Sequence, residues 1–350
     1  MYPARSFAFR ALICACLCGA AVIAAASTAF AASSGHTSAA AGSLTIYSGQ
    51  HEQTVSQLVA DFEKRTGVKV AVRSADEATL AKQILQEGSR SPADVFFAEN
   101  PPALQELAER KLLATVPAAT LKAVPSADSS PQHVWVGVSA RAAALVYNTK
   151  LAKDGDLPTS LLDLAKPKWK GKVAIAPGET DFQPLLTSIV HLRGKASAEA
   201  WLKGIKSNAK VYDDNELIVA AVNKGKVATG LVDHYYWYRL RDEVGKSNTH
   251  SALHYFAPHD PGMLVDVSGA AILRSSKNSA EAKRFLAYLV GKGAQTIIAT
   301  SESYEYPLGS GVTTKKVAVP LSDLVPARVS AAQLGDGKAA LVMLQQVGLL

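Results

Sequence analysis

From residue 43 onward the sequence alternates between short apolar runs and amphipathic stretches, and this alternation limits the possible fold more than any other feature. The amphipathic stretches carry apolar residues at helical spacing, and the first of them is followed by Gly67, a typical helix end. The expected elements follow one another as strand 44–47, helix 55–62, strand 68–72, helix 78–87, strand 95–98 and helix 103–111. Such an order favours a largely parallel sheet covered by helices, so we expect an α/β fold.

The second half of the chain repeats this style after two extended segments, at 134–138 and 143–147. The further elements that we expect are a short helix at 161–165, strands at 173–176, 227–232 and 264–273, and helices at 184–192, 196–206, 216–223, 279–289 and 294–298. Two α/β blocks joined by extended segments predict two lobes that can hinge around a cleft. Composition alone does not separate such a binding protein from an exported α/β enzyme.

The N-terminus has the pattern of an export signal. Arg5 and Arg10 precede an uncharged apolar run at 11–26, and Ala29-Phe30-Ala31 supplies the small residues that a signal peptidase recognises. The run is short for a membrane span, and no later stretch reaches the roughly 18 apolar residues that a span needs. We therefore expect a signal peptide at 1–31, a flexible leader at 32–42 and a periplasmic or otherwise extracytoplasmic protein.

Charge and cysteine content exclude several functions. The net charge is +7, and removal of the two arginines leaves +5, which is too weak and dispersed to predict nucleic-acid binding. All three cysteines (Cys14, Cys16 and Cys18) lie in the apolar run. The mature chain would then have no disulfide, thiolate metal site or cysteine nucleophile. A lipid-attached cysteine remains the alternative to cleavage near Ala31.

The most unusual local motif is Tyr235-Tyr236-Trp237-Tyr238, which follows a strand directly and precedes Arg239. Core packing is the ordinary explanation for clustered aromatic residues. At a strand-to-helix turn, however, Tyr235 and Tyr236 could both aim their oxygens into a cleft. The positive end of the helix dipole would favour the phenolate form. No GxSxG, HExxH, Walker or GxGxxG motif occurs, and we interpret Gly309-Ser310-Gly311 as a turn.

With these tyrosines, the chain resembles the periplasmic ferric-ion-binding proteins of bacterial iron ABC transporters. The resemblance extends from residue 43 to about 308, and its motifs are Ile46-Tyr47-Ser48-Gly49-Gln50-His51, Ala93-Asp94-Val95-Phe96-Phe97-Ala98-Glu99 and Tyr235-Tyr236-Trp237. It implies a two-lobed type II periplasmic-binding fold with iron in the interlobe cleft. It also implies His51, Glu99, Tyr235 and Tyr236 as metal ligands. The expected partner is an ABC permease in the inner membrane; we expect a monomer without enzymatic activity.

The chemistry of Fe(III) agrees with this ligand set. Fe(III) prefers anionic oxygen donors and accepts imidazole. Two phenolates and a carboxylate neutralise its three charges, and four ligands leave two octahedral positions, which many family members fill with a small anion such as carbonate. Taken alone, His51 would be an ordinary loop residue. Glu99 follows a buried strand at the edge where α/β clefts open.

One segment departs from the family pattern. Phosphate-binding members have small neutral residues where this chain has Pro177-Gly178-Glu179-Thr180-Asp181-Phe182. Glu179 and Asp181 would repel a phosphate and could themselves reach the iron or a ligand, although Asp181 is equally suited to cap a helix. Asn215 and Arg141 fall near positions that contact anions in relatives.

Lobe boundaries and alternative functions complete the expectations. We predict an N-terminal lobe from 43–140 plus 268–318 and a C-terminal lobe from 141–267 plus 319–350. The first alternative keeps this fold and binds a small organic anion or a phosphorylated sugar. An exported hydrolase is the second alternative, and the missing nucleophile motif disfavours it.

Overall fold

The computed structural model describes residues 42–309 and 311–350. The export signal, the three cysteines, almost all of the leader and Ser310 lie outside the described residues. Within these residues, no helix is both long and apolar enough to cross a membrane.

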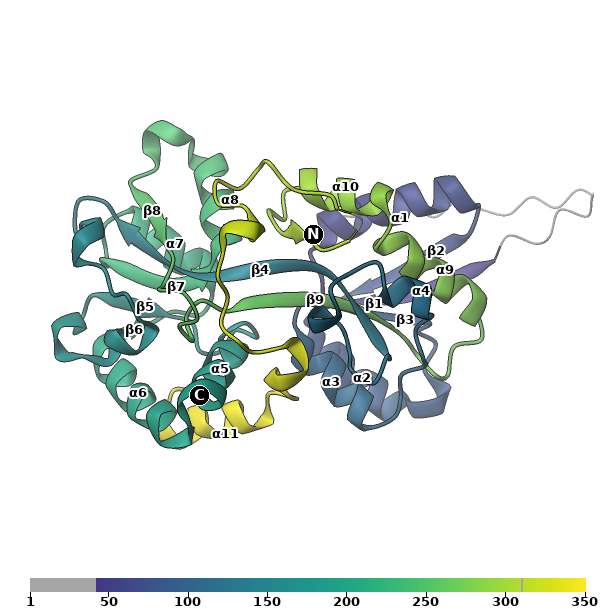
Figure 1. Ribbon diagram of the computed structural model, residues 1–350, viewed down its shortest axis with the longest axis horizontal. Coiled ribbons are helices and arrows are strands. Elements are labelled where there is room, and N and C mark those ends of the chain that lie inside the picture. Colours follow the sequence, from purple (N-terminus) through teal and green to yellow (C-terminus); the bar gives the residue numbers. More distant parts are fainter. Residues whose placement is uncertain (1–41, 310) are drawn as a thin grey trace, which may run out of the picture. The chain divides into compact units, whose positions relative to one another are not determined.

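The described chain alternates between strands and helices, as Figure 1 shows. The strands are β1 (Ser43–Ser48), β2 (Lys69–Ser74), β3 (Val95–Ala98), β4 (Trp135–Asn148), β5 (Val173–Ile175), β6 (Ala209–Val211), β7 (Thr229–Asp233), β8 (Ser251–His254), β9 (Val265–Ile272) and β10 (Tyr306–Pro307). The helices are α1 (Glu52–Thr66), α2 (Glu77–Glu87), α3 (Pro101–Glu109), α4 (Ala118–Leu121), α5 (Phe182–Arg193), α6 (Lys195–Asn208), α7 (Asn215–Asn223), α8 (His234–Val244), α9 (Ser279–Leu289), α10 (Lys292–Thr300) and α11 (Lys338–Val347).

The strands form one mixed sheet in the order β2-β1-β3-β9-β4-β7-β5-β6, with β8 and β10 also paired to β4. The pairs at its two ends, β2-β1-β3 and β7-β5-β6, are parallel. The middle pairs are antiparallel because β9 and β4 run against their neighbours. The expectation of a largely parallel sheet is therefore correct only for the two ends.

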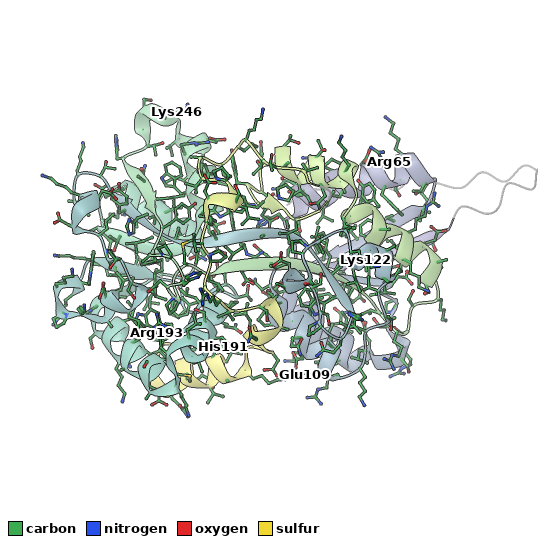
Figure 2. All side chains as sticks on the ribbon, viewed as in Figure 1. Arg65, Glu109, Lys122, His191, Arg193 and Lys246 are labelled. Carbon is green, nitrogen blue, oxygen red and sulfur yellow. The ribbon has the colours of Figure 1, made fainter. Side chains whose placement is uncertain are left out.

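Apolar side chains on the two sides of this sheet form separate buried clusters. One cluster joins β1, β3 and the start of β4 to helices α1, α9 and α10. Another joins the end of β4, β5 and β7 to α5, α6 and α11. Charged side chains such as Arg65, Glu109 and Lys246 point away from the ribbon (Figure 2). Strand β4 thus runs from one buried cluster into the next.

Most predicted elements are present within a few residues of their expected bounds, and four differences stand out. The two extended segments at 134–138 and 143–147 are one continuous strand, β4, of 14 residues. Strands β6, β8 and β10 were not predicted. All three have no more than four residues and, unlike the equally short β3 and β5, they are not continuous apolar runs.

Candidate metal centre

His51 and Glu99 come from neighbouring parallel strands. Strands β1 and β3 pair in register, with Ser48 opposite Phe97, so their carboxyl ends lie together. His51 follows β1 and stands at the N-terminus of α1, and Glu99 directly follows β3. Between Ser48 and His51, a side chain at Gly49 would lie 2.5 Å from Cβ of Glu77, so this close approach requires glycine. We call His51 and Glu99 the histidine side of the centre.

Tyr235 and Tyr236 come from one continuous turn. Strand β7 ends at Asp233 and α8 begins at His234, so the two tyrosines are the second and third residues of the helix. Their ring centroids are 4.1 Å apart, and both residues are buried. The predicted strand-to-helix turn is therefore confirmed. Together with Asp181, we call these tyrosines the tyrosine side.

The two sides meet at Glu99. Tyr235 donates a hydrogen bond from its hydroxyl to Glu99 Oε1 (3.1 Å), and His51 Nε2 lies 3.5 Å from the same oxygen. The His51 and Tyr235 ring centroids are 5.0 Å apart. His51 Nε2 is buried and has no hydrogen-bond partner among the described residues, so it is available to a metal ion. The structure thus brings His51, Glu99 and Tyr235 into contact, and Tyr236 lies beside Tyr235.

No group of three or more His, Cys, Asp or Glu side chains in the part of the chain that the structure describes is arranged to hold a metal ion. At the meeting point of the two sides, the hydroxyl of Tyr235 lies beside Glu99 and His51, so the candidate donors there include a tyrosine oxygen. Such a mixed set of oxygen donors and one imidazole suits a hard cation.

The histidine side is ready to bind a cation near neutral pH. Burial lowers the pKa of His51 despite the attraction of Glu99, so its imidazole is neutral at pH 7. Burial alone would raise the pKa of Glu99, but the charges of His51 and Arg141 and the Tyr235 hydrogen bond outweigh it and lower that pKa. Glu99 is therefore ionised near neutral pH.

The hydroxyl groups of Tyr235 and Tyr236 are protonated near neutral pH. Burial raises the pKa of both Tyr235 and Tyr236 well above the ordinary value, and the nearby carboxylates add to this effect. The partial positive charge at the helix N-terminus therefore does not make these tyrosines phenolates, because their pKa values are raised above the ordinary value. A bound cation would have to displace the phenolic protons.

Arg141 lies at the middle of β4 and is completely buried. It donates hydrogen bonds to the Glu99 carbonyl oxygen and to Asn100 Oδ1. It also forms ion pairs with Asp233 (3.2 Å) and Glu305 (3.5 Å). Neighbouring carboxylates outweigh its burial and raise the pKa of Arg141 further, so it stays charged. Its donors are thus turned toward acceptors of the protein itself.

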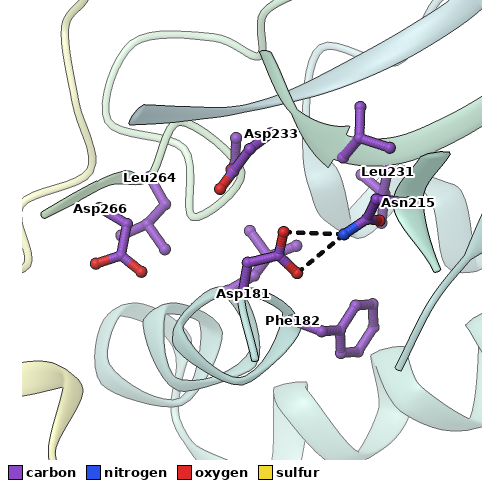
Figure 3. A pocket seen from close by; sticks show the side chains of 10 residues that line it. Asp181, Phe182, Asn215, Leu231, Asp233, Leu264 and Asp266 are labelled. Carbon is purple, nitrogen blue, oxygen red and sulfur yellow. Dashed lines mark hydrogen bonds between the residues drawn. The ribbon is translucent and has the colours of Figure 1, made fainter. Parts of the chain in front are cut away.

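Asp181 precedes α5 without capping it, because its side chain makes no capping hydrogen bond. Its two oxygens instead accept hydrogen bonds from Asn215 Nδ2, at 2.9 and 3.2 Å (Figure 3). Asp181, Asn215, Asp233 and Asp266 line a small cavity of about 20 Å³, enough for one water-sized group, and none of the four expected ligands lines it. Burial raises the pKa of Asp181, and Asp233 and Glu179 raise it further.

Glu179 differs from Asp181 in its surroundings. Partial burial, together with the charges of Glu216 and Asp214, raises the pKa of Glu179 to about 7. No hydrogen bond of its side chain to another described residue was found. Of the two acidic residues in this segment, Asp181 is the one whose position is fixed.

The family of bacterial extracellular solute-binding proteins matches residues 44–301, which is most of the chain. The chain belongs to this family. Its structural relatives have an α/β, two-lobed type II periplasmic-binding fold. This is the fold predicted from the sequence.

Proteins similar to this solute-binding protein carry names or titles that refer to iron. The Fe(3+)-binding periplasmic protein of Serratia marcescens is 40% identical over 307 residues, which cover 88% of this chain and 90% of that protein. The crystal structure of iron-bound HitA from Pseudomonas aeruginosa matches with a TM-score of 0.83 and 38% identity, over 88% of this chain and 99% of that one. A Trichodesmium protein in complex with iron and citrate matches with a TM-score of 0.78 and 28% identity, over 88% and 99%.

The sequence did not predict three residues that form hydrogen bonds around the candidate centre, namely Gln50, His234 and Glu305. Glu305 accepts a hydrogen bond from Gln50, and Gln50 accepts one from the His51 backbone. His234 accepts a hydrogen bond from Ala142 N–H at Nδ1, so its Nε2–H donates to the Tyr304 carbonyl oxygen. Gln50 and His234 adjoin predicted ligands in the sequence, which is the one signal that could have revealed them. Glu305 offers no such signal.

Proposed function

We propose that this protein captures Fe(III) between the histidine side and the tyrosine side and performs no turnover. The observation that carries this proposal is the meeting of three suitable donors, with Glu99 at hydrogen-bond distance from Tyr235 and close to His51 Nε2, and with Tyr236 beside Tyr235. The names of its relatives, which refer to ferric iron, support it.

The donor set selects for a small, highly charged cation. Two phenolates and one carboxylate supply three negative charges, and the neutral imidazole adds a fourth donor. Removing the protons of two buried phenols requires a strong Lewis acid. Fe(III) meets this requirement, whereas an alkali or alkaline-earth ion would leave the phenols protonated.

We further infer that Asp181 takes the place of a bound phosphate. Asn215 and Arg141, the residues suited to contact an anion, are occupied by Asp181 and by acceptors around Glu99. An added phosphate would meet the buried carboxyl groups of Asp181, Asp233 and Asp266. A smaller anion such as carbonate, or citrate as named for the Trichodesmium complex, is the alternative that the experiment below examines.

Export and delivery belong to the same proposal. The chain would lose residues 1–31, reach the periplasm and pass iron to an ABC permease in the inner membrane. Opening and closure of lobes formed by 43–140 plus 268–318 and by 141–267 plus 319–350 would separate the two sides and return them to their contact at Glu99. The intact mass of the exported protein decides between cleavage near Ala31 and a lipid on a cysteine.

A visible absorption spectrum tests the central proposal. Fe(III), supplied as its nitrilotriacetate complex, should produce a phenolate-to-iron charge-transfer band in the purified protein. The band should form without added phosphate, and parallel samples with phosphate, carbonate or citrate show whether an anion contributes. A protein that stays colourless in every sample would refute iron binding by the tyrosines. Tight binding of a phosphorylated sugar by such a protein would then favour the alternative ligand class.

A further inference from the structure

Glu305 is a buried carboxylate whose partners come from separate parts of the chain. It is 1% exposed and accepts hydrogen bonds from Gln50 Nε2 with both oxygens, at 3.2 and 3.3 Å. Ser139 Oγ donates to its Oε2 at 3.1 Å, and Arg141 Nη1 lies 3.5 Å from its Oε1. Glu305 therefore connects the loop after β1 to the middle of β4.

Gln50 passes this connection to His51. Gln50 is 3% exposed, and its Oε1 accepts a hydrogen bond of 2.7 Å from His51 N–H. A carboxylate only accepts and a backbone N–H only donates, so one orientation of the Gln50 amide satisfies both partners. If Glu305 lost its carboxylate, the Gln50 amino group would be left without that acceptor. The amide would then be free to turn away from His51.

The backbone beside Glu305 is itself unusual. Tyr304 has a φ of 57°, a left-handed conformation that a bulky residue adopts only when its surroundings enforce it. Tyr238 stacks on its ring at 5.4 Å, Lys316 Nζ lies 4.3 Å from the ring centroid, and Asp242 accepts a hydrogen bond from its hydroxyl. Its carbonyl oxygen accepts a hydrogen bond from His234, the residue before Tyr235.

The turn at 304–305 is thus hydrogen-bonded to two residues, one directly before Tyr235 and one directly before His51 in the sequence. Tyr304 is joined to His234, and Glu305 is joined to Gln50. We propose that Glu305 is a positioning residue that sets the place of the His51 imidazole relative to the two tyrosines, by holding Gln50. This inference rests on the proposed function, because it treats His51 as an iron ligand.

A double-mutant cycle tests the proposal in the full exported protein. Fe(III) affinity is measured by competition with nitrilotriacetate for wild type, Glu305→Ala, His51→Ala and the double variant. We expect Glu305→Ala to weaken binding by roughly 10- to 100-fold, the range usual for residues that orient a metal ligand. In a protein that already carries His51→Ala, adding Glu305→Ala should lower Fe(III) affinity little further. The imidazole that Glu305 is proposed to position is then no longer present. The charge-transfer band of Glu305→Ala should keep its position, since both tyrosines still bind.

Controls separate positioning from folding. Glu302→Ala removes an exposed carboxylate from the same segment and should bind iron like wild type. Gln50→Ala should reproduce the loss of Glu305→Ala, and it replaces that variant if Glu305→Ala does not fold by circular dichroism. Glu305→Gln keeps an acceptor for Gln50 and should lose less than Glu305→Ala.

Two outcomes overturn the inference while the proposed function stands: unchanged affinity in a folded Glu305 or Gln50 variant, and losses that simply add to that of His51→Ala. A wild-type protein that binds no Fe(III) would overturn the proposed function itself.

Discussion

The two tyrosines are more deeply buried than the histidine side of the centre, and the acidic groups of the two sides respond differently to their surroundings. Glu99 keeps a lowered pKa because His51, Arg141 and the hydrogen bond from Tyr235 stabilise its charge against the effect of burial. Tyr235, Tyr236 and Asp181 have raised pKa values because burial and neighbouring carboxylates oppose ionisation. On the proposed function, the protons released on iron binding would therefore come from the two tyrosines, while the histidine side would supply donors that are already free of protons.

The strongest consequence is a steep pH dependence of iron affinity. Both phenols remain protonated between pH 7 and 5, so binding must expel two protons, and affinity should fall by roughly two log units per pH unit. Because the pKa of His51 is lowered, its contribution should appear only in the acid part of this range. Burial and the charges of Asp233, Glu179 and Glu99 raise the pKa of Asp181, so any proton that its carboxyl group holds would be released as well. Competition titrations at several pH values measure the slope, and a slope near zero would contradict the paired-tyrosine centre.

Removing one phenol hydroxyl tests directly whether the tyrosine side binds iron. Tyr235→Phe and Tyr236→Phe each delete one oxygen donor and keep the ring's packing. Each should weaken Fe(III) binding by more than about 100-fold, beyond the range usual for supporting residues. Isothermal titration measures the affinity, and circular dichroism checks the fold. Tyr288→Phe, which removes a hydrogen-bonded hydroxyl in α9, is the matched control. Wild-type affinity in Tyr235→Phe or Tyr236→Phe would remove that tyrosine from the centre.

Glu77, near Glu99 of the histidine side, differs from Glu99 because its pKa is raised. Glu77 accepts two hydrogen bonds from Asn100, and burial raises its pKa to about 8. A raised pKa stabilises the folded protein at low pH, and this stabilisation is lost as the pH rises through 8. For this group the free energy of unfolding should be about 2 kcal/mol larger at pH 6 than at pH 8.

Urea unfolding of wild type and Glu77→Gln at both pH values, without iron, measures this contribution. The substitution should reduce the pH dependence. Equal pH dependence in the two proteins would show that Glu77 ionises normally.

Asp181→Asn should have the smallest effect. It removes one negative charge from the tyrosine side and keeps the size of the side chain. We expect iron affinity to fall by about tenfold, the pH slope to decrease by up to one, and added phosphate to matter more than in wild type. Glu179→Gln, which changes the less fixed acid, is the matched control and should change affinity less. An unaffected Asp181→Asn variant in a protein that needs phosphate would contradict the role given to Asp181.

Local patterns predicted the parts of the molecule that depend on local sequence. The helix ending at Gly67 has a periodic apolar face, and the Tyr235-Tyr236 turn follows an apolar strand, so both could be recognised. Strand β4 was divided in the prediction because the small residues and Arg141 at its centre resemble a loop. In the structure, Arg141 is buried there because carboxylates from distant segments surround it.

The support of the centre depends on contacts that no local pattern encodes. Gln50 and Glu305 are 255 residues apart in the sequence. The pKa values of the tyrosines depend on burial between elements whose packing the sequence does not display. The resemblance to ferric-ion-binding proteins, carried by short motifs at strand ends, therefore predicted the candidate ligands, whereas their supporting residues and protonation states required the fold.

The most direct test is a crystal structure of the iron-loaded protein with anomalous scattering measured at the iron edge. We predict one strong anomalous peak within bonding distance of His51 Nε2, a Glu99 carboxylate oxygen and both tyrosine hydroxyl oxygens, with the Asp181 side chain close by. A peak located elsewhere, or one that contacts neither tyrosine, would contradict the assignment of this centre as the iron site.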